Sequence, residues 1–253
     1  MTPLRAAVAD EQIQPAAADR PAATLDETRW KQAGAKRWLW VAVTRLVTRF
    51  SRAGTRGGAE LAQLLGSSYR GFLVSDRHRA SPCLDVCQRH VWWAHLTRDM
   101  LGDSQYTGPT GAWGQRALEV VAHLFARWHR FKHQDLDRAT WPAEIKPIQE
   151  TCAGLLAQGA VLPAHQARGF CTDLTKLAPA LGTFLTVEGV APTTTAAEPA
   201  LRPAVLWRQG AFGSHSDAGL RFVERILTVT ATCRQQDRHL LSFLTESVSK
   251  KLS

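Results

Sequence analysis

Short apolar runs separated by turn residues predict a sheet in the first hundred residues. WLWVAV, from Trp38 to Val43, and the segment from Leu46 to Phe50 are typical of strands covered on at least one face. GFLVSD (71–76) and HVWWAH (90–95) predict two further strands. A short helix is expected between these pairs, because leucines recur at helical spacing after the Gly57-Gly58 turn. The alternation of strand, helix and strand indicates an α/β fold.

Helical periodicity dominates the rest of the chain. From Gly111 to about Leu185 the pattern predicts an all-helical insertion. From Asp217 to Leu252 it predicts two helices that close the core. The apolar stripe of the insertion's first helix consists of Leu118, Val121, Leu124, Phe125 and Trp128. The apolar positions of the last two helices are Phe222, Val223, Ile226 and Leu227, then Leu240, Leu241, Phe243 and Leu244.

These patterns divide the chain into four predicted parts. Residues 1–22 form a flexible tail or linker, and the Ala/Pro-rich stretch up to Thr24 is also a poor β-strand. Residues 23–103 form the first part of the α/β core, 104–190 the helical insertion, and 191–253 the closing helices of the core.

The charge balance favours a polyanionic partner. Lys and Arg number 31 against 22 Asp and Glu, an excess that attracts phosphates such as those of DNA. The first helix of the insertion also carries a basic stripe, which is either a solvated face or a face that follows phosphates. Its residues are Arg116, His123, Arg127 and Arg130.

Targeting and redox signals indicate a cytoplasmic protein. No stretch has the eighteen or more apolar residues of a membrane span, and the first residues lack a signal peptide, so neither export nor a membrane is expected. Five cysteines, an odd number and mostly far apart, suit reduced thiols. Cys83, Cys87 and His90 form a weak zinc pattern without a second cysteine pair, and ordinary thiols are the favoured interpretation.

Three acidic residues stand where an α/β fold presents side chains for chemistry. Asp26 precedes the first strong strands, Asp76 ends one, and Glu198 follows a Pro-Thr-Thr-Thr helix start. Carboxylates that converge repel each other, and Mg²⁺ relieves that repulsion. Each acid also has a structural interpretation: Asp26 begins a turn, Asp76 is a solvated strand end, and Glu198 completes a capping box with Thr195.

The chain resembles the insertion-sequence-66 family of transposases in several blocks that follow one order. These blocks are LDETRWKQAGAKRWLWVAVT (25–44), GFLVSDR (71–77), WAHLTRD (93–99), PTTTAAEPALRPAVLWRQGAFGSHSDAGLRFVERILTVTATCRQQ (192–236) and LLSFLTESV (240–248). The resemblance implies an RNase H-like mixed sheet flanked by helices, with an all-helical insertion before the last acidic residue. It also implies a DDE transposase that cleaves and joins DNA in transposition.

The resemblance assigns the family's functional positions residue by residue. Its three catalytic, metal-binding acids fall on Asp26, Asp76 and Glu198, which would hold Mg²⁺, with Mn²⁺ as substitute, in two sites. Its DNA-contact positions near these acids fall on His95, Arg98, Arg202, Arg208 and Ser216. A packing role is the alternative for His95, because a lone histidine is often a core residue with its hydrogen bonds satisfied. The implied partner is double-stranded DNA, both transposon ends and target, bound by a homo-oligomer of the full-length protein at the bacterial nucleoid.

Departures from the family pattern leave a second function open. Arg29 replaces a glycine, Thr194 and Thr195 replace two asparagines, and Pro199 replaces an arginine, where it is expected to distort a helix starting at Thr195. The segment ADRPAATL (18–25) lacks the apolar character of the family's first strand. The chain thus resembles an N-terminally truncated catalytic part. The alternatives are an inactive remnant that at most binds DNA, and a nuclease of the same fold that cuts without joining.

Overall fold

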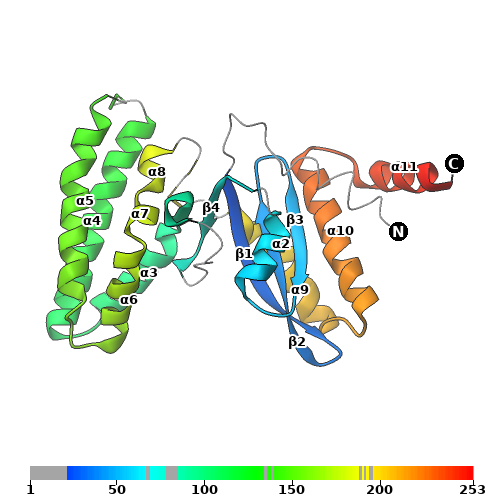
Figure 1. Ribbon diagram of the computed structural model, residues 1–253, viewed down its shortest axis with the longest axis horizontal. Helices are drawn as coiled ribbons and strands as arrows, with labels where there is room; N and C mark the ends of the chain where they lie inside the picture. Colours follow the sequence, from blue (N-terminus) through cyan, green and yellow to red (C-terminus); the bar gives the residue numbers. More distant parts are fainter. Residues whose placement is uncertain are drawn as a thin grey trace. The chain divides into compact units, whose positions relative to one another are not determined.

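The chain folds into two compact units in the computed structural model, which describes residues 22–66, 69–77, 85–133, 136–137, 139–187, 190, 192–193 and 196–252. The first unit comprises Met1–Arg89 and Thr194–Ser253. The second comprises His90–Thr193. Figure 1 shows the sheet and its flanking helices in the first unit and a group of helices in the second.

The first unit is built on a mixed sheet, which confirms the predicted α/β class. Its strands are β1 (Ala22–Gln32), β2 (Ala35–Val43), β3 (Thr48–Ala53) and β4 (Phe72–Ser75), and the order β3-β2-β1-β4-β5 is completed by β5 (Arg89–Val91). β1, β2 and β3 pair antiparallel, whereas β1 and β4 pair parallel. Ala33 and Gly34 join β1 to β2 with φ of 48° and 80°, the left-handed conformation that a two-residue hairpin turn requires.

β1 begins earlier than the sequence predicts. Ala22, Ala23 and Thr24 pair with Phe72, Leu73 and Val74 of β4, so the expectation of a poor strand up to residue 24 is wrong for these three residues. Alanine has low strand propensity, but pairing with β4, and at Thr24 also with β2, overrides it. Residues 18–21 of the doubtful segment lie outside the described residues.

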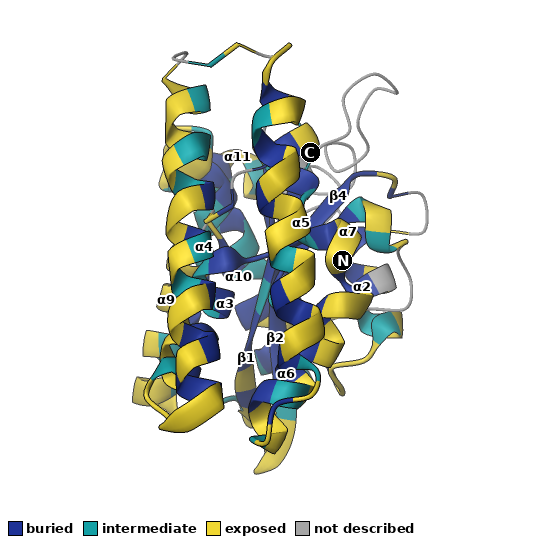
Figure 2. Ribbon diagram, turned by 90° about the vertical axis from the view of Figure 1, so that its left-hand side faces the viewer, coloured by how far each residue is buried: buried dark blue, intermediate teal, exposed yellow. Residues whose placement is uncertain are grey.

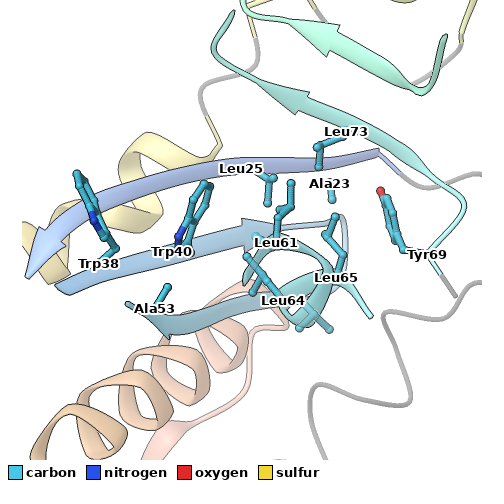
Figure 3. Close-up of a cluster of buried hydrophobic side chains, with 12 residues drawn as sticks. Ala23, Leu25, Trp38, Trp40, Ala53, Leu61, Leu64, Leu65, Tyr69 and Leu73 are labelled. Atoms are coloured by element: carbon cyan, nitrogen blue, oxygen red, sulfur yellow. The ribbon is translucent and has the colours of Figure 1, made fainter. Parts of the chain in front are cut away.

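One face of the sheet packs on the predicted leucine helix, α2 (Gly58–Leu65). Leu61, Leu64 and Leu65 are buried, as predicted, against Trp40 of β2 and Leu25 of β1 (Figure 3). Apolar burial of this kind contributes about 25 cal/mol per Å² of surface removed from water. This cluster fixes which side chains of β1 point inward.

The opposite face and the outer edge of the sheet are covered by α9 (Ala197–Ala211) and α10 (Asp217–Gln235). Edge strand β3 would leave backbone groups without partners. Two threonines of α10 supply them: the Phe50 N–H donates to Thr228 Oγ1 (2.9 Å), and the Thr232 hydroxyl donates to the Thr48 carbonyl (2.9 Å). The edge is therefore closed by side chains of a helix.

The chain ends in α11 (Leu240–Leu252), so both predicted closing helices exist. Phe243 is buried against Val229 and Cys233 of α10. The predicted apolar face of α10 is wrong at Phe222, which is 58% exposed and packs edge-on against Trp207 of α9. Phe222 is adjacent to Val223 in sequence and therefore looks like part of the apolar stripe, but adjacent helical residues point in different directions, and Phe222 points away from the sheet.

The second unit is helical, as predicted for Gly111–Leu185. Its helices are α3 (Trp93–Ser104), α4 (Gly108–Lys132), α5 (Trp141–Gly159), α6 (His165–Lys176), α7 (Ala178–Leu181) and α8 (Thr183–Thr186). Exposed residues follow the outer faces of α4 and α5 (Figure 2). Three tryptophans inside the unit donate their indole N–H to carbonyls, Trp93 to Leu181 (3.1 Å), Trp113 to Leu155 (2.8 Å) and Trp141 to Leu185 (2.8 Å). The large rings are buried without leaving a donor unpaired.

The predicted strand HVWWAH (90–95) is only partly correct. β5 ends at Val91, and α3 begins at Trp93 with Trp92 as its N-cap. An apolar run of this length fits a strand and a buried helix start equally well, and packing decides between them.

No helix among the described residues has the length and apolarity that crossing a bilayer requires.

The tight turn after α9 provides a stability test. Gly213 has φ of 119°, and a Cβ there would overlap the Lys31 carbonyl oxygen of β1. We expect Gly213→Ala to lower the free energy of unfolding by about 1–3 kcal/mol, measured by chemical denaturation. The matched control is Gly210→Ala in α9, where a Cβ meets no atom within 4 Å and alanine should stabilise by about 0.5–1 kcal/mol. Equal effects of the two substitutions would contradict the close approach of this turn to β1.

Candidate active site

The two faces of β1 carry different chemistry. Ala23 and Leu25 point into the core beneath α2. Side chains alternate along a strand, so Thr24, Asp26 and Thr28 point to the α9 side. The contact of Thr28 with Arg208 of α9 agrees with this alternation. Asp26 is therefore held at the sheet surface by the burial of its neighbour Leu25.

The register of β1 and β4 brings Asp26 and Asp76 together. Ala22 pairs with Phe72 and Thr24 with Val74, a constant offset in a parallel ladder. Continued by two residues, this offset sets Asp76 beside Asp26, with Asp76 directly following Ser75 at the end of β4. Adjacent strands lie about 4.8 Å apart, and both side chains fall on the α9 side by alternation. Both carboxylates are partly exposed.

Asp26 is also fixed locally. Its Oδ1 accepts a hydrogen bond from the backbone N–H of Glu27 (2.8 Å). A carboxylate held by a backbone donor has fewer rotamers to sample, so its position is set before any ligand arrives.

Glu198 lies in the first turn of α9, the helix above Asp26. α9 runs in the direction of β1, because Ala196 and Pro199 border the same hollow as Val43, while Arg208 reaches Thr28. Val43 pairs with Thr24, so the start of α9 is level with the first half of β1.

The helical turn decides which way Glu198 points. Ala197, Leu201 and Ala204 are the buried, sheet-facing residues. Ala200 and Pro203 border the hollow on the β2, β3 and α10 side. With 3.6 residues per turn, Glu198 falls on the other flank, toward the β4 side of β1. The structure thus brings Asp26 and Asp76 together and aims Glu198 toward them, but no three His, Cys, Asp or Glu side chains in the described part of the chain form a metal-binding group.

The capping box predicted for Glu198 involves Thr195 and stays a prediction. The N-cap is Ala196, without a side-chain hydrogen bond, and Thr194 and Thr195 lie outside the described residues. Pro199 is then the third residue of the helix, where the missing N–H has no intrahelical partner to lose. The expected distortion by Pro199 is wrong, because α9 continues unbroken to Ala211.

Arg208 and Ser216 already have structural roles in the first unit. The Arg208 guanidinium donates to Thr28 Oγ1 (2.9 Å) and to the Arg29 carbonyl (2.8 Å), which ties the end of α9 to β1. Ser216 caps α10, accepting from the Gly219 N–H (3.1 Å). Arg202, by contrast, is exposed on α9.

The remaining predicted DNA contacts lie in the second unit. The His95 ring on α3 contacts the Trp92 ring at a tilted angle of 54°, with centroids 5.2 Å apart, and Arg98 on the same helix is exposed. On α4, Arg116 and Arg130 are exposed, whereas Arg127 lies 3.5 Å from a carboxylate oxygen of Glu144. DNA binding by these residues stays a prediction.

Sequence reasoning missed an ion pair next to Asp26, between a buried glutamate and a half-exposed arginine. Glu27 is buried on the α2 face and accepts from Arg56 Nε (2.8 Å), while the Arg56 guanidinium lies 4.4 Å from the centre of the Trp38 ring. Alternation was the available signal, because Glu27 shares its face with Leu25. Desolvated and paired, Glu27 helps to fix the strand that carries Asp26.

The cysteine and histidine pattern does not form a zinc site in the described residues. Cys83 lies outside them, Cys87 is exposed, and the His90 ring is buried with Nδ1 3.3 Å from the Ala180 carbonyl oxygen. The Asp85 carboxylate raises the pKa of the Cys87 thiol, which disfavours the thiolate that zinc requires.

Two arginines of α9, Arg208 bonded to β1 and Arg202 exposed, allow a test of whether the Arg208 hydrogen bonds stabilise the fold. We expect Arg208→Gln to lower the free energy of unfolding by about 1–2 kcal/mol, because it removes hydrogen bonds from a charged donor to β1. Arg202→Gln should change it by no more than about 0.5 kcal/mol. Denaturant titration of both variants measures the difference, and an Arg208 variant as stable as the Arg202 variant would show that this anchor is dispensable.

Comparison with known proteins identifies the family. A model of the family described as Transposase IS66 family matches residues 5–221, most of the chain. Searches of curated proteins and of solved structures found no match. The family match agrees with the resemblance in the sequence blocks around Asp26, Asp76 and Glu198. The chain belongs to the IS66 family of transposases.

Proposed function

We propose that this chain is the catalytic domain of a DDE transposase with an RNase H-like sheet. In this proposal Asp26, Asp76 and Glu198 carry metal-dependent DNA cleavage and strand transfer. The observation that carries the proposal is the β1–β4 register, which ends at the Thr24–Val74 pair. Continued by two residues, it supports a position of Asp26 beside Asp76 on one face of a mixed sheet. Membership of a transposase family makes DNA the expected substrate.

The donor chemistry of the acids fits a hard divalent cation. Carboxylate oxygens are the ligands that Mg²⁺ prefers, and Mn²⁺ accepts the same set. Asp26 and Asp76 would hold it, with Glu198 as the third ligand. When bound, two such ions supply Lewis-acid stabilisation of the attacking and leaving oxygens in an in-line phosphoryl transfer.

The protein contributes positioning. Asp26 pairs with Val41 of β2, and two residues before it Thr24 pairs with strands on both sides, so the backbone of Asp26 is held by the sheet. Asp76 leaves the end of β4, where the backbone is released from the ladder and can adjust. Glu198 sits on the first turn of α9, whose far end is anchored by Arg208. Asp26 and Glu198 therefore lie on rigid elements, whereas Asp76 lies on backbone that can adjust. This combination suits a site that closes on a phosphodiester.

DNA would be held chiefly through its phosphates. The chain has an excess of basic residues, and phosphate contacts position a duplex without reading its sequence. Arg202 is the best placed of the expected contacts near the acids, because it is exposed on the same helix as Glu198. Arg208 and Ser216 have their side chains engaged in hydrogen bonds within the fold, so their main role is structural.

The proposal predicts that Asp76→Ala abolishes Mg²⁺- or Mn²⁺-dependent cleavage and strand transfer on DNA that carries the element's ends. We expect a loss of about 100-fold or more, equivalent to about 2.7 kcal/mol of transition-state stabilisation. Asp26→Asn should behave alike, and chelation of the metal should abolish activity of the unmodified chain. The assay measures labelled cleaved and joined products.

Glu246→Gln is the matched control, since Glu246 is an exposed acid on α11 in the same unit. It should retain full activity. Equal activity of the Asp76→Ala variant and the unmodified chain would overturn the assignment, and cleaved products without joined ones would indicate a nuclease. Inactivity of every protein, including the unmodified chain, would reject catalysis by this chain.

A further inference from the structure

A second polar feature of the first unit lies at the far end of β1 from the acids. It is a cavity of about 500 Å³ bordered by the β1–β2 hairpin, β3, α2 and α10. Its charged and polar lining includes Gln32, Arg37, Arg52, Asp217, Arg221 and Arg225. The volume lies within the range of small-molecule sites.

The acids of this cavity are already engaged. Arg52 forms ion pairs with Asp217 and with Glu224, the latter with Nε and Oε2 3.5 Å apart. Arg221 also pairs with Asp217, at 3.2 Å. Two carboxylates thus offset the charges of two arginines.

Two other arginines add positive charge that no carboxylate offsets. Arg37 donates only to neutral acceptors, Gln32 Oε1 (3.1 Å) and the Lys36 carbonyl (3.2 Å). Arg225 borders the cavity from α10 and is partly exposed. Among the residues that the structure describes, neither takes part in an ion pair. The cavity therefore has an excess of two positive charges.

The chemistry of the lining selects phosphate. Guanidinium groups bind phosphate oxygens through paired N–H donors and remain charged at any physiological pH. None of the described lining residues is aromatic, so the cavity offers no platform on which an unpaired base could stack. A phosphate of an intact duplex backbone fits this lining better than a nucleotide base or a splayed single strand.

We propose that this cavity binds the phosphate backbone of duplex DNA through Arg37 and Arg225. The inference rests on the proposed function in taking DNA as the partner. Gln32 is six residues along β1 from Asp26, about 20 Å of extended strand. That length corresponds to about six nucleotide steps of 3.4 Å, so one duplex can reach both places.

The test measures binding of a short duplex of arbitrary sequence in a chelating buffer, as a function of salt. Each phosphate contact contributes about one unit to the slope of log affinity against log salt, so Arg37→Gln/Arg225→Gln should reduce the slope by about two. Affinity at low salt should fall about tenfold or more. The control Arg45→Gln/Arg234→Gln removes the same charge from two exposed positions outside the cavity and should change the slope by less than half as much.

Two additional variants keep the inference falsifiable if the double variant folds poorly. Arg225→Gln alone should reduce the slope by about one. Asp217→Asn removes a carboxylate that competes for Arg52 and Arg221, and should strengthen duplex binding a few-fold. Circular dichroism establishes that each variant is folded.

The outcomes separate this cavity from the acid site and from a free-phosphate site. Equal slopes for the cavity and control variants would overturn the inference. Stabilisation of the protein by inorganic phosphate, without a slope difference in duplex binding, would assign the cavity to free phosphate and also overturn it. Asp76→Ala should keep the full slope, so failure of catalysis leaves a positive binding result intact.

Discussion

The pairing of β1 with strands on both sides is the constraint on which the rest of the first unit depends. It sends Ala23 and Leu25 into the core under α2 and Asp26 to the opposite face. A shift of the β1 pairing register by one residue would bury the Asp26 carboxylate and expose Leu25, which would lower the stability of the fold by several kcal/mol. The position of a chemically useful acid is therefore a consequence of where apolar side chains are buried.

α9 extends this constraint to the third acid. Its buried residues seat it on β1 and β2, and Arg208 holds its last turn to the β1 backbone. Trp30 adds a second connection beyond the helix, donating its indole N–H to Ser214 Oγ (3.1 Å). These contacts set the rotation of α9, and the rotation decides that Glu198 faces the β4 side rather than the hollow beside α10.

Much of the fold follows from periodicity, but its boundaries depend on tertiary contacts. The strand at Trp38–Val43 and the helix with Leu61 are predictable because strong apolar patterns coincide with their burial. The start of β1 is not predictable, since Ala22–Thr24 form a strand through their pairing with β4, a contact distant in sequence. The same holds for Phe222 in a helix. The sequence shows that this residue is apolar, but not that it points away from the sheet and stays largely exposed.

The candidate site divides along the same line. Residue type and resemblance select Asp26, Asp76 and Glu198, but only the strand register, which pairs Thr24 with Val74, indicates that the chain leads the two aspartates to neighbouring positions. The basic cavity has no motif at all, since Arg37 and Arg225 are far apart in sequence and meet through the hairpin and α10. Strand β1 runs from the candidate acid site to the basic cavity, and its hydrogen-bonded, extended backbone fixes the distance between them. Bending DNA costs free energy, so a rigid spacing between a reacting phosphate and a bound one would select duplexes whose backbone already matches it.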